Sequence, residues 1–472
     1  MVLMPSTRSV SAYVSLQKLQ SRLQGAVFVP GDKGYDDARK AWNLTVDHRP
    51  AVIVVAHSAA DVVEAVRFAN EKDLGIAVQA TGHGASRLAD NDALLIVMSQ
   101  MRKVVVDAKS QTAWVGGGAK WAVVLEKAQA VGLAPLLGST PDVGAVGYTL
   151  GGGMGWLARK HGLSADSVNF FEVVNANGEI LHVSPEENSD LFWGLRGGGG
   201  SFGVVTGMEI RLYPVTTVFG GNLLYPVAVA KEVFTRYRDW IKNAPDELTA
   251  SISIMNFPSI PQVPEFLRGQ SVVFVRGCYA GPIEDGKALL QPWLDWMEPI
   301  ANQWSVMPFS QVGTISTDPE DPMPSFSTAV WLRDLSDEVI DTILNHAISV
   351  DGSSPIIGTE IRYAGGAISK VNAQTNAYGN RDANLILQML GLTPSPQVEQ
   401  ALRQFTEQFK AELGQHLTGG VYINFLEGEE KWARTKDAFL PETYRKLMAL
   451  KALHDPQNRF RYSFNIPPMK AQ

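Results

Sequence analysis

A histidine set between glycines is the first feature of the sequence that could do chemistry. His83 lies in the stretch QATGHGAS, residues 79–86, directly after an apolar run. Glycine neighbours would let the backbone and the imidazole approach a ligand closely. The ordinary alternative is a structural histidine held by hydrogen bonds. On its own, His83 marks a candidate binding site without naming a ligand.

Glycines crowd one region of the chain. Of the 43 glycines, many fall between Gly116 and Gly203. Because glycine is entropically costly, such crowding predicts tight turns or a backbone that approaches something closely. A flexible linker would lack apolar residues, yet Val143, Leu150 and Trp156 lie within this region. We therefore interpret it as part of a folded binding surface.

Common nucleotide-binding and hydrolase motifs do not fit this chain. Gly153, Gly155 and Ala158 match G-x-G-x-x-A, but a turn-rich stretch precedes them where a Rossmann site needs a strand. The similar pattern at 198–203 follows a helix-like stretch and precedes a strand, so its context is also wrong. The motifs G-x-x-x-x-G-K-[ST], G-x-S-x-G and H-E-x-x-H are absent. We expect neither nucleotide hydrolysis nor a metal site.

Charge and cysteine content exclude further classes. The chain has 41 Lys and Arg against 48 Asp and Glu, a net charge of -7, so it lacks the basic surface that binds nucleic acid or anionic membranes. Its single cysteine, Cys278, cannot form an internal disulfide or a thiolate cluster. No stretch approaches the roughly 20 apolar residues of a bilayer span, and the N-terminus has no apolar signal segment. We expect a soluble, cytoplasmic protein.

Alternating strands and helices must position the glycine-rich motifs. Residues 51–55 predict a buried strand, and Ser58 with Asp61 predicts the start of a helix. The apolar face of that helix is predicted at Val62, Val63, Val66 and Ala69. Further strands are predicted at 76–80, 94–97, 104–107 and 113–116, and a helix at 120–131. Asn177-Gly178 predicts a hairpin with a two-residue turn.

The pattern changes after Pro214. Helical segments at 228–243, 283–297 and 335–349 mix with the strands SISIM, SVVFV and IIGTEIR. This mixture indicates a second α+β domain. From about Gly419 the pattern changes again, with a predicted strand VYINFL and a predicted helix at 441–453. The acidic run at 427–430 predicts a solvated helix start.

Four ordered blocks of the sequence resemble flavoproteins of the vanillyl-alcohol-oxidase fold, in the berberine-bridge-enzyme-like branch. The blocks are ATGHG at 80–84; GSTPDVGAVGYTLGGGMGW at 138–156 with RKHGLSAD at 159–166; DLFWGLRGGGGSFGVVT at 190–206; and the tail motifs YIN at 422–424, HDPQNRF at 454–460 and FNIP at 464–467. They follow the family's order, which makes the resemblance far more specific than any single glycine pattern.

The resemblance implies an α+β fold with a two-part FAD-binding domain of the PCMH type. A second α+β substrate domain, a sheet flanked by helices, would cover the flavin. We expect the FAD-binding domain at 1–215, with its PCMH-type core at about 46–215, and the substrate domain at 216–418. A C-terminal berberine-bridge-like segment at 419–472 would return to the FAD-binding domain.

The resemblance also implies covalently bound FAD. In the family, the histidine of the first block is bonded to the 8α-methyl of FAD, so the link would form at His83. Backbone N–H groups of the glycine-rich turns would meet the FAD pyrophosphate. The implied cofactor-binding residues are Thr81, Gly82, His83, Gly84, Ala85, Ser86, Gly138, Ser139, Thr140, Val143, Gly144, Val146, Gly147, Tyr148, Gly151, Gly152, Gly155, Gly203, Val204, Val205, Asn424 and Asn465.

Two departures from the family pattern change these expectations. Relatives with a second covalent link carry a cysteine in a Gly-Thr-Cys-Pro turn, where this chain has Thr140. Threonine cannot form a thioether, so we expect FAD bonded through His83 and no cysteinyl link. Ala145 and Val146 replace the Val-Gly pair that many relatives carry beside the flavin. Because that region influences oxygen access, the choice between oxidase and dehydrogenase stays open.

Tyr422 is the implied catalytic base. It matches the family position from which a tyrosine hydroxyl faces the substrate, and Asn424 would share its face of a strand. A phenol titrates near pH 10, so it needs a nearby cation or hydrogen bonds to act as a base at neutral pH. Tyr378, the second catalytic candidate, and Arg381 resemble another family segment that could supply this help. The alternative is that Tyr422 only packs within a half-buried strand.

These implications favour a flavin-dependent oxidoreductase, an oxidase in preference to a dehydrogenase. It would remove a hydride from a small alcohol, sugar or secondary metabolite, with dioxygen as the electron acceptor. A flavin-binding protein that has lost turnover is the alternative class, because a fold alone does not establish function. Tyr422 and the complete set of glycines favour the enzyme. The substrate and the oligomeric state are not encoded in any motif.

Overall fold

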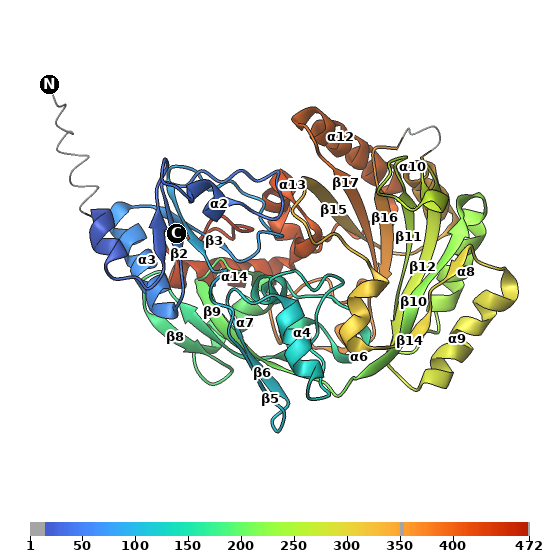
Figure 1. The fold of residues 1–472 in the computed structure, drawn as a ribbon, viewed down its shortest axis with the longest axis horizontal. Coiled ribbons are helices and arrows are strands. Elements are labelled where there is room, and N and C mark those ends of the chain that lie inside the picture. The colour runs from blue at the N-terminus through green and yellow to red at the C-terminus, as the bar shows by residue number, and fades with distance from the viewer. Residues whose placement is uncertain (1–14, 350–353, 471–472) are drawn as a thin grey trace.

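Three β-sheets organise the protein (Figure 1). The computed structural model describes residues 15–349 and 354–470. Two smaller sheets come from the part of the chain before Pro214, and the largest sheet comes from the part after it. Helices and sheets are mixed without a regular βαβ repeat, so the fold is α+β, as the sequence predicts.

The four-stranded sheet carries the first candidate loop. Its order is β1 (Ala26–Phe28), β2 (Val52–Val55), β4 (Ala93–Val97) and β3 (Gly75–Gln79). Helix α3 (Ala59–Lys72) begins at Ser58, whose side chain accepts a hydrogen bond from the N–H of Asp61. Val62 and Val66 on this helix are fully buried against the sheet. The predicted apolar face is confirmed, and β3 ends where the His83 loop begins.

A five-stranded antiparallel sheet follows. Its order is β5 (Val104–Asp107), β6 (Thr112–Gly116), β9 (Val204–Arg211), β7 (Val168–Val174) and β8 (Ile180–Val183). The hairpin of β7 and β8 is confirmed, but the predicted two-residue turn is wrong. The loop spans 175–179 because the Asn175 side chain accepts hydrogen bonds from the N–H groups of Asn177 and Glu179 and thereby holds a wider turn.

Short helices lie in the connections between strands of the same sheet, and three of them carry glycine-rich blocks. They are α2 (Tyr35–Arg39), α4 (Trp121–Gln129), α5 (Ala145–Leu150), α6 (Ala158–His161) and α7 (Ser189–Gly198). Helix α5 occupies part of the stretch that the sequence indicated as turns. Gly144 precedes its first turn and Gly151 follows its last residue, so glycines lie at both ends of this helix.

The largest sheet has eight strands. They are β10 (Thr217–Pro226), β11 (Leu248–Asn256), β12 (Ser271–Tyr279), β13 (Ala301–Asn302), β14 (Ser305–Pro308), β15 (Ser325–Leu332), β16 (Gly358–Tyr363) and β17 (Leu385–Leu392). The helices beside it are α8 (Ala230–Ile241), α9 (Ile283–Trp296), α10 (Asp337–Ala347), α11 (Ala367–Lys370) and α12 (Pro396–Leu413). Because side chains alternate along a strand, Ile252 and Ile361 join a core with α8, α10 and α12. Their neighbours Ser251 and Arg362 lie on the opposite face.

The C-terminal segment returns to the first half of the molecule. Helices α13 (Gly428–Ala433) and α14 (Pro441–His454) form it, and in Figure 1 the red α14 lies beside the green α7. Gly194 of α7 permits this packing, since a Cβ there would lie 2.3 Å from Leu450 of α14. Among residues 15–349 and 354–470, every helix falls short of the length and apolarity that a bilayer crossing requires.

The predicted strand VYINFL is wrong. Residues Ile423–Phe425 form a short 3-10 turn instead. The backbone N–H groups of Phe425 and Leu426 bond back to Tyr422 and Ile423, so local hydrogen bonds replace a strand ladder. Apolar alternation alone does not separate these two solutions in so short a segment.

Candidate active site

The loop that carries His83 packs directly on the chain at residues 41–42. Gly82 adopts a φ of +84°, and a Cβ there would lie 2.7 Å from the backbone of Ala41 and Trp42. Only glycine suits this position. The Trp42 ring stacks on the His83 imidazole, with 4.2 Å between the ring centroids and 19° between the planes. The loop therefore presents the imidazole in one fixed orientation.

Asp142, in the second glycine-rich block, is the polar partner of His83. Its Oδ2 lies 3.4 Å from His83 Nε2, while its Oδ1 is bonded by the Lys120 ammonium. Burial lowers the pKa of His83, and the hydrogen bond with Asp142 partly opposes this effect. The imidazole is therefore neutral at pH 7. The first two sequence blocks, distant along the chain, meet at this contact.

The turn that holds Thr140 is tied to the second half of the molecule. Ser139 and Thr140 donate hydrogen bonds from their hydroxyls to Asp318 Oδ2, at 2.7 and 2.5 Å. Asp318 lies in the loop before β15. The neighbouring Gly144 abuts the His83 loop, because a Cβ there would lie 3.3 Å from Ala80 Cβ. The predicted cofactor loops thus lie together, next to the loop that precedes β15.

Tyr422 is held by hydrogen-bond donors. Its hydroxyl oxygen accepts from the N–H of Gly153 at 3.1 Å, the N–H of Met154 at 3.0 Å and the Asn424 amide at 3.1 Å. Gly153 has a φ of +81°, which lets two successive N–H groups converge on one atom. Burial raises the pKa of Tyr422 above its usual value, and these bonds and the charge of Arg362 offset that rise only in part. Asn424 lies beside Tyr422, but a 3-10 turn places it there and not the shared strand face that was predicted.

Tyr378 lies next to Tyr422 but has a different environment. The two rings are 6.0 Å apart in an edge-to-face arrangement. The buried Tyr378 hydroxyl has no hydrogen-bond partner among the described residues, and burial raises its pKa well above the usual value. Arg381 is bonded to Asp166 at 2.7 Å. Arg381 is therefore committed elsewhere, and the cation that lowers the pKa of Tyr422 is Arg362.

Arg362 belongs to a charged row on the large sheet. Its Nε donates to Glu360 Oε2 at 2.8 Å, and the Ser251 hydroxyl donates to Glu360 Oε1 at 2.7 Å. Arg276 lies 3.5 Å from the same carboxylate. Ser251 and Arg276 occupy paired positions on β11 and β12, and Ser251 also pairs with Arg362 on β16. The sheet register therefore places these groups on one face.

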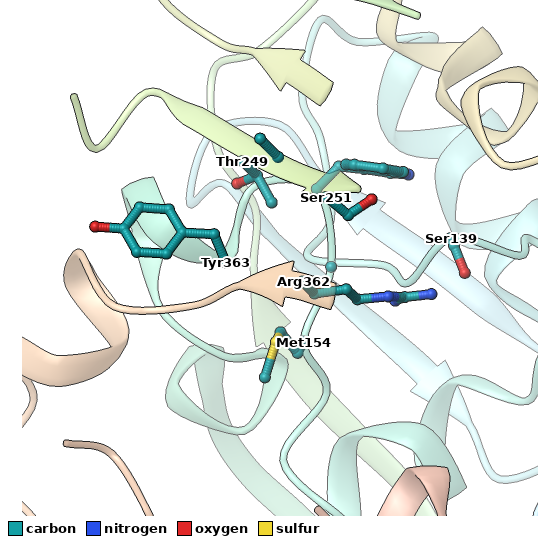
Figure 2. A pocket seen from close by; sticks show the side chains of 9 residues that line it. Ser139, Met154, Thr249, Ser251, Arg362 and Tyr363 are labelled. Carbon is teal, nitrogen blue, oxygen red and sulfur yellow. The ribbon is translucent and has the colours of Figure 1, made fainter. Parts of the chain in front are cut away.

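This face borders a small cavity of about 20 Å³ (Figure 2). The residues lining it are Ser139, Met154, Gly155, Trp156, Thr249, Ala250, Ser251, Arg362 and Tyr363. In Figure 2 the Arg362 side chain extends from its strand in the direction of Ser139. Met154 contributes both to the cavity wall and, through its N–H, to the hydrogen bonds on Tyr422. The cavity thus adjoins the predicted base.

Sequence motifs did not identify the charged row. The available signal was the segment TEIRY, in which Glu360 and Arg362 alternate with Ile361 in a buried strand. Two charges on one face of a buried strand are unusual unless they are paired. Locating their partners on β11 and β12 required the strand register, which sequence spacing does not provide.

The acidic run at 427–430 is not a solvated helix start as predicted. Helix α13 does begin at Gly428, but Glu427 accepts a hydrogen bond from Ser325, and Glu430 accepts one from Lys410 at 2.7 Å. Burial raises the pKa of Glu427 to about 7. Lys431 donates to the carbonyl of Gly84 at 3.0 Å, and burial lowers its pKa to about 8. Helix α13 therefore supports the His83 loop.

The remaining cofactor candidates occupy distinct places. Val204 and Val205 begin β9, and Gly203 directly precedes it. A Cβ on Gly203 would lie 2.7 Å from Val173, so close packing against β7 explains this glycine. Gly151 and Gly152 pack against the side chains of Asn424 and Tyr378.

The candidate site fits a large polar cofactor such as FAD. The Ser86 hydroxyl, the Tyr148 hydroxyl and Asn465 Oδ1 are buried and have no hydrogen-bond partner in the described part of the chain. Buried polar atoms without partners call for a bound group. A Cβ on Gly147 would meet nothing within 4 Å, so the backbone of α5 is open to close approach. Within residues 15–349 and 354–470, His, Cys, Asp and Glu side chains form no group suited to a metal ion.

Comparison with known proteins also indicates FAD as the cofactor. Residues 50–184 match the family model of the FAD binding domain. An FAD-linked oxidoreductase of Dictyostelium discoideum is 28% identical, covering 99% of this chain and 100% of its own length. The (R)-6-hydroxynicotine oxidase of Paenarthrobacter nicotinovorans is 27% identical, covering 94% of this chain and 97% of its own length.

Solved structures share the fold. The berberine-bridge-enzyme-like protein 1 of Physcomitrella patens superposes with a TM-score of 0.84 at 22% identity, covering 97% of this chain and 100% of that one. The glucooligosaccharide oxidase of Acremonium strictum, described with 6-S-cysteinyl, 8α-N1-histidyl FAD, gives a TM-score of 0.82 at 23% identity over the same shares. The chain therefore carries an FAD binding domain, is similar along its whole length to FAD-linked oxidoreductases and oxidases, and shares the fold of the berberine-bridge-enzyme-like structure.

Proposed function

We propose that this protein is an oxidase that acts on an alcohol carbon of a sugar or secondary metabolite, with FAD bonded to His83 alone and Tyr422 as the base. The main observation in support is that the Tyr422 hydroxyl is buried beside the cavity and accepts three hydrogen bonds. The described residues offer its own proton no acceptor. This arrangement suits a phenolate better than a phenol, which both donates and accepts.

Several residues of the chain would hold the cofactor. His83 would carry the covalent link, and the glycine-rich turns at 138–155 would present backbone N–H groups. The unpartnered Ser86, Tyr148 and Asn465 would supply polar contacts. Bound FAD supplies the hydride acceptor that no side chain can provide. Because Thr140 stands where a second link would need cysteine, the histidyl link described for the glucooligosaccharide oxidase is the one proposed here.

Proton removal from the substrate falls to the protein. A phenolate at Tyr422 can accept the alcohol proton, and the N–H groups of Gly153 and Met154 stabilise its charge before the substrate arrives. Arg362 adds a positive charge from the sheet above, and Glu360 holds that guanidinium in place. The substrate would lie in the cavity that Arg362 and Met154 share.

The proposal includes the division of the chain. Residues 1–215 with 419–472 would bind FAD, and 216–418 would cover the flavin and select the substrate. The sheet boundaries near Pro214 and the packing of α14 on α7 support this division.

A panel of sugars, alcohols and polyphenols tests the function. Purified enzyme mixed anaerobically with a true substrate should lose its flavin colour and regain it on exposure to air. Tyr422→Phe should keep the bound flavin and slow this bleaching by about 10²- to 10⁴-fold, the usual contribution of a general base. Tyr378→Phe should slow bleaching less than Tyr422→Phe does, because the Tyr378 hydroxyl makes no hydrogen bond with the described residues.

Three outcomes would contradict the proposal. Unchanged bleaching in Tyr422→Phe would remove the assigned base. Colour that returns only with an artificial acceptor would make the protein a dehydrogenase. No bleaching with any member of a broad panel would favour a flavin-binding protein without turnover.

A further inference from the structure

We propose that Asp142 is a positioning residue for covalent attachment of the flavin, and that it directs the bond to Nδ1 of His83. Its carboxylate holds the imidazole in the tautomer that carries hydrogen on Nε2, which leaves the Nδ1 lone pair free. This inference rests on the proposed function, in which His83 is the tethered residue.

Two neighbours fix the plane of the imidazole and the direction in which Nε2 points. Trp42 stacks on one face of the ring at 4.2 Å, and Asp142 Oδ2 lies 3.4 Å from Nε2. The His83 and Asp142 side chains are each only 15% exposed, so water competes little for this contact. Nδ1 receives no hydrogen bond from the residues that the structure describes. One nitrogen is therefore occupied and the other is available.

The charges around His83 keep its nitrogen nucleophilic. The groups that face it are Asp142 and Asp318, Lys120 on the far oxygen of Asp142, and Lys431 on the Gly84 carbonyl. Burial lowers the pKa of the imidazole, so it enters the reaction neutral. A protonated ring would have no lone pair to donate.

Covalent attachment changes the charge of the imidazole. A bond forms from His83 Nδ1 to the 8α carbon, one C–H bond of that methyl group breaks, and the imidazole loses its N–H proton. The two hydrogens and two electrons that leave are taken by dioxygen, which becomes hydrogen peroxide. While Nε2 still carries hydrogen, the alkylated ring is a cation. Asp142 would stabilise that cation until the Nε2 proton leaves to solvent, as a carboxylate stabilises the imidazolium of a catalytic histidine elsewhere.

The test follows covalent attachment in full-length apoprotein produced in flavin-depleted cells. The protein is mixed with FAD in air, samples are denatured over time, and the flavin fluorescence of the protein band is measured. Asp142→Asn should slow attachment at least about tenfold, because an amide can donate to Nε2 and select the wrong tautomer. Asp142→Glu should recover most of the rate. Non-covalent FAD binding and the melting temperature should stay near wild type in both variants.

Lys120→Met is the matched control. It removes the other partner of the Asp142 carboxylate and should slow attachment less than about threefold. An equal slowing in Lys120→Met and Asp142→Asn would show that the carboxylate only anchors its loop, which overturns the inference. So would loss of non-covalent FAD binding in Asp142→Asn.

The site of the bond is an independent readout. NMR of the flavin peptide from wild-type protein should show substitution at Nδ1, and substitution at Nε2 would refute the inference. His83→Ala distinguishes failure of the proposed function from failure of this inference. Covalent flavin in His83→Ala would show that His83 is not the attachment site. If His83→Ala carries no covalent flavin but Asp142→Asn attaches flavin at the wild-type rate, only the role of Asp142 is refuted.

Discussion

The Tyr422 hydroxyl shows how neighbours can prepare a weak base. Desolvation opposes ionisation of this phenol, yet two backbone N–H groups and an amide converge on its oxygen. Arg362 adds the nearby cation that a phenol needs for work at neutral pH. The sequence pointed to Arg381 for this cation, but the structure pairs Arg381 with Asp166. The positive charge near Tyr422 comes instead from a strand that no motif marked.

Replacing Arg362 by methionine should therefore shift the pH dependence of the enzyme. A base works when deprotonated, so kcat/KM rises with pH as Tyr422 ionises. Because Arg362 lowers the pKa of Tyr422, its removal should move this rise to higher pH. A loss of roughly 1.4 kcal/mol of phenolate stabilisation would lower kcat/KM at pH 7 about tenfold. Measuring kcat/KM from pH 6 to 10 checks this.

Arg276→Met is the comparison for that profile. Arg276 contacts the same Glu360 but lies on β12, two strands away from Arg362. Its removal should leave the position of the rise nearly unchanged. An equal displacement in both variants would mean that the charged row acts as a whole and that Arg362 has no special relation to Tyr422.

Helix α5 and the turns beside it show what the clustered glycines do. Gly155 has no room for a side chain, since a Cβ would lie 1.7 Å from the carbonyl oxygen of Leu137. Gly147, on α5, has nothing within 4 Å of the same atom. The first glycine is required by packing within the protein. The second leaves the helix backbone accessible, which suits close approach of a cofactor.

Alanine at these two glycines should separate folding from flavin binding. Gly155→Ala should lower the free energy of unfolding by about 1–3 kcal/mol or more, because a backbone carbonyl must move to admit the methyl group. Gly147→Ala should leave stability unchanged or raise it by about 1 kcal/mol, since alanine favours a helix. It should nevertheless lower flavin occupancy. Urea denaturation and the flavin absorbance per chain measure the two effects, and full occupancy in Gly147→Ala would place the cofactor elsewhere.

At the scale of the whole molecule, the site forms where the two halves of the chain meet. The first half supplies His83 and Thr140, the large sheet supplies Arg362, and the C-terminal segment supplies Tyr422. Asp318 links the halves through its bonds with Ser139 and Thr140. Glu427 is enclosed at the same junction, beside Ser325 of β15. Because Glu427 is buried there, its ionisation makes the stability of the folded protein depend on pH.

Stability should therefore fall between pH 5 and 7.5 partly because of Glu427. Its pKa of about 7 in the folded protein exceeds the ordinary 4.5, so the folded state holds the proton more tightly and loses stability as pH rises through this window. Glu427→Gln should remove about 1–3 kcal/mol of that loss. Denaturant unfolding at both pH values measures it. The exposed Glu429→Gln is the control, and an unchanged pH response in Glu427→Gln would show that this carboxyl is ionised throughout.

Much of this architecture was predictable, and the reasons differ by segment. The α3 helix was predictable because Ser58 and the 3.6-residue apolar spacing are local signals. The four blocks identified the His83 loop and Tyr422 because their order is specific. The charged row was not predictable, since Glu360, Ser251 and Arg276 meet only through strand pairing between distant segments. The predicted strand at Tyr422 was wrong for a different reason: a strand and a tight turn have similar apolar patterns in so short a segment.

The flavin content of denatured protein tests the central claim most directly. Wild-type protein, precipitated with acid and washed, should retain its yellow colour at about one flavin per chain, and the added mass should lie on the peptide that contains His83. The same treatment of His83→Ala should release all flavin into the supernatant. A colourless wild-type pellet, or a flavin on any other peptide, would contradict the account.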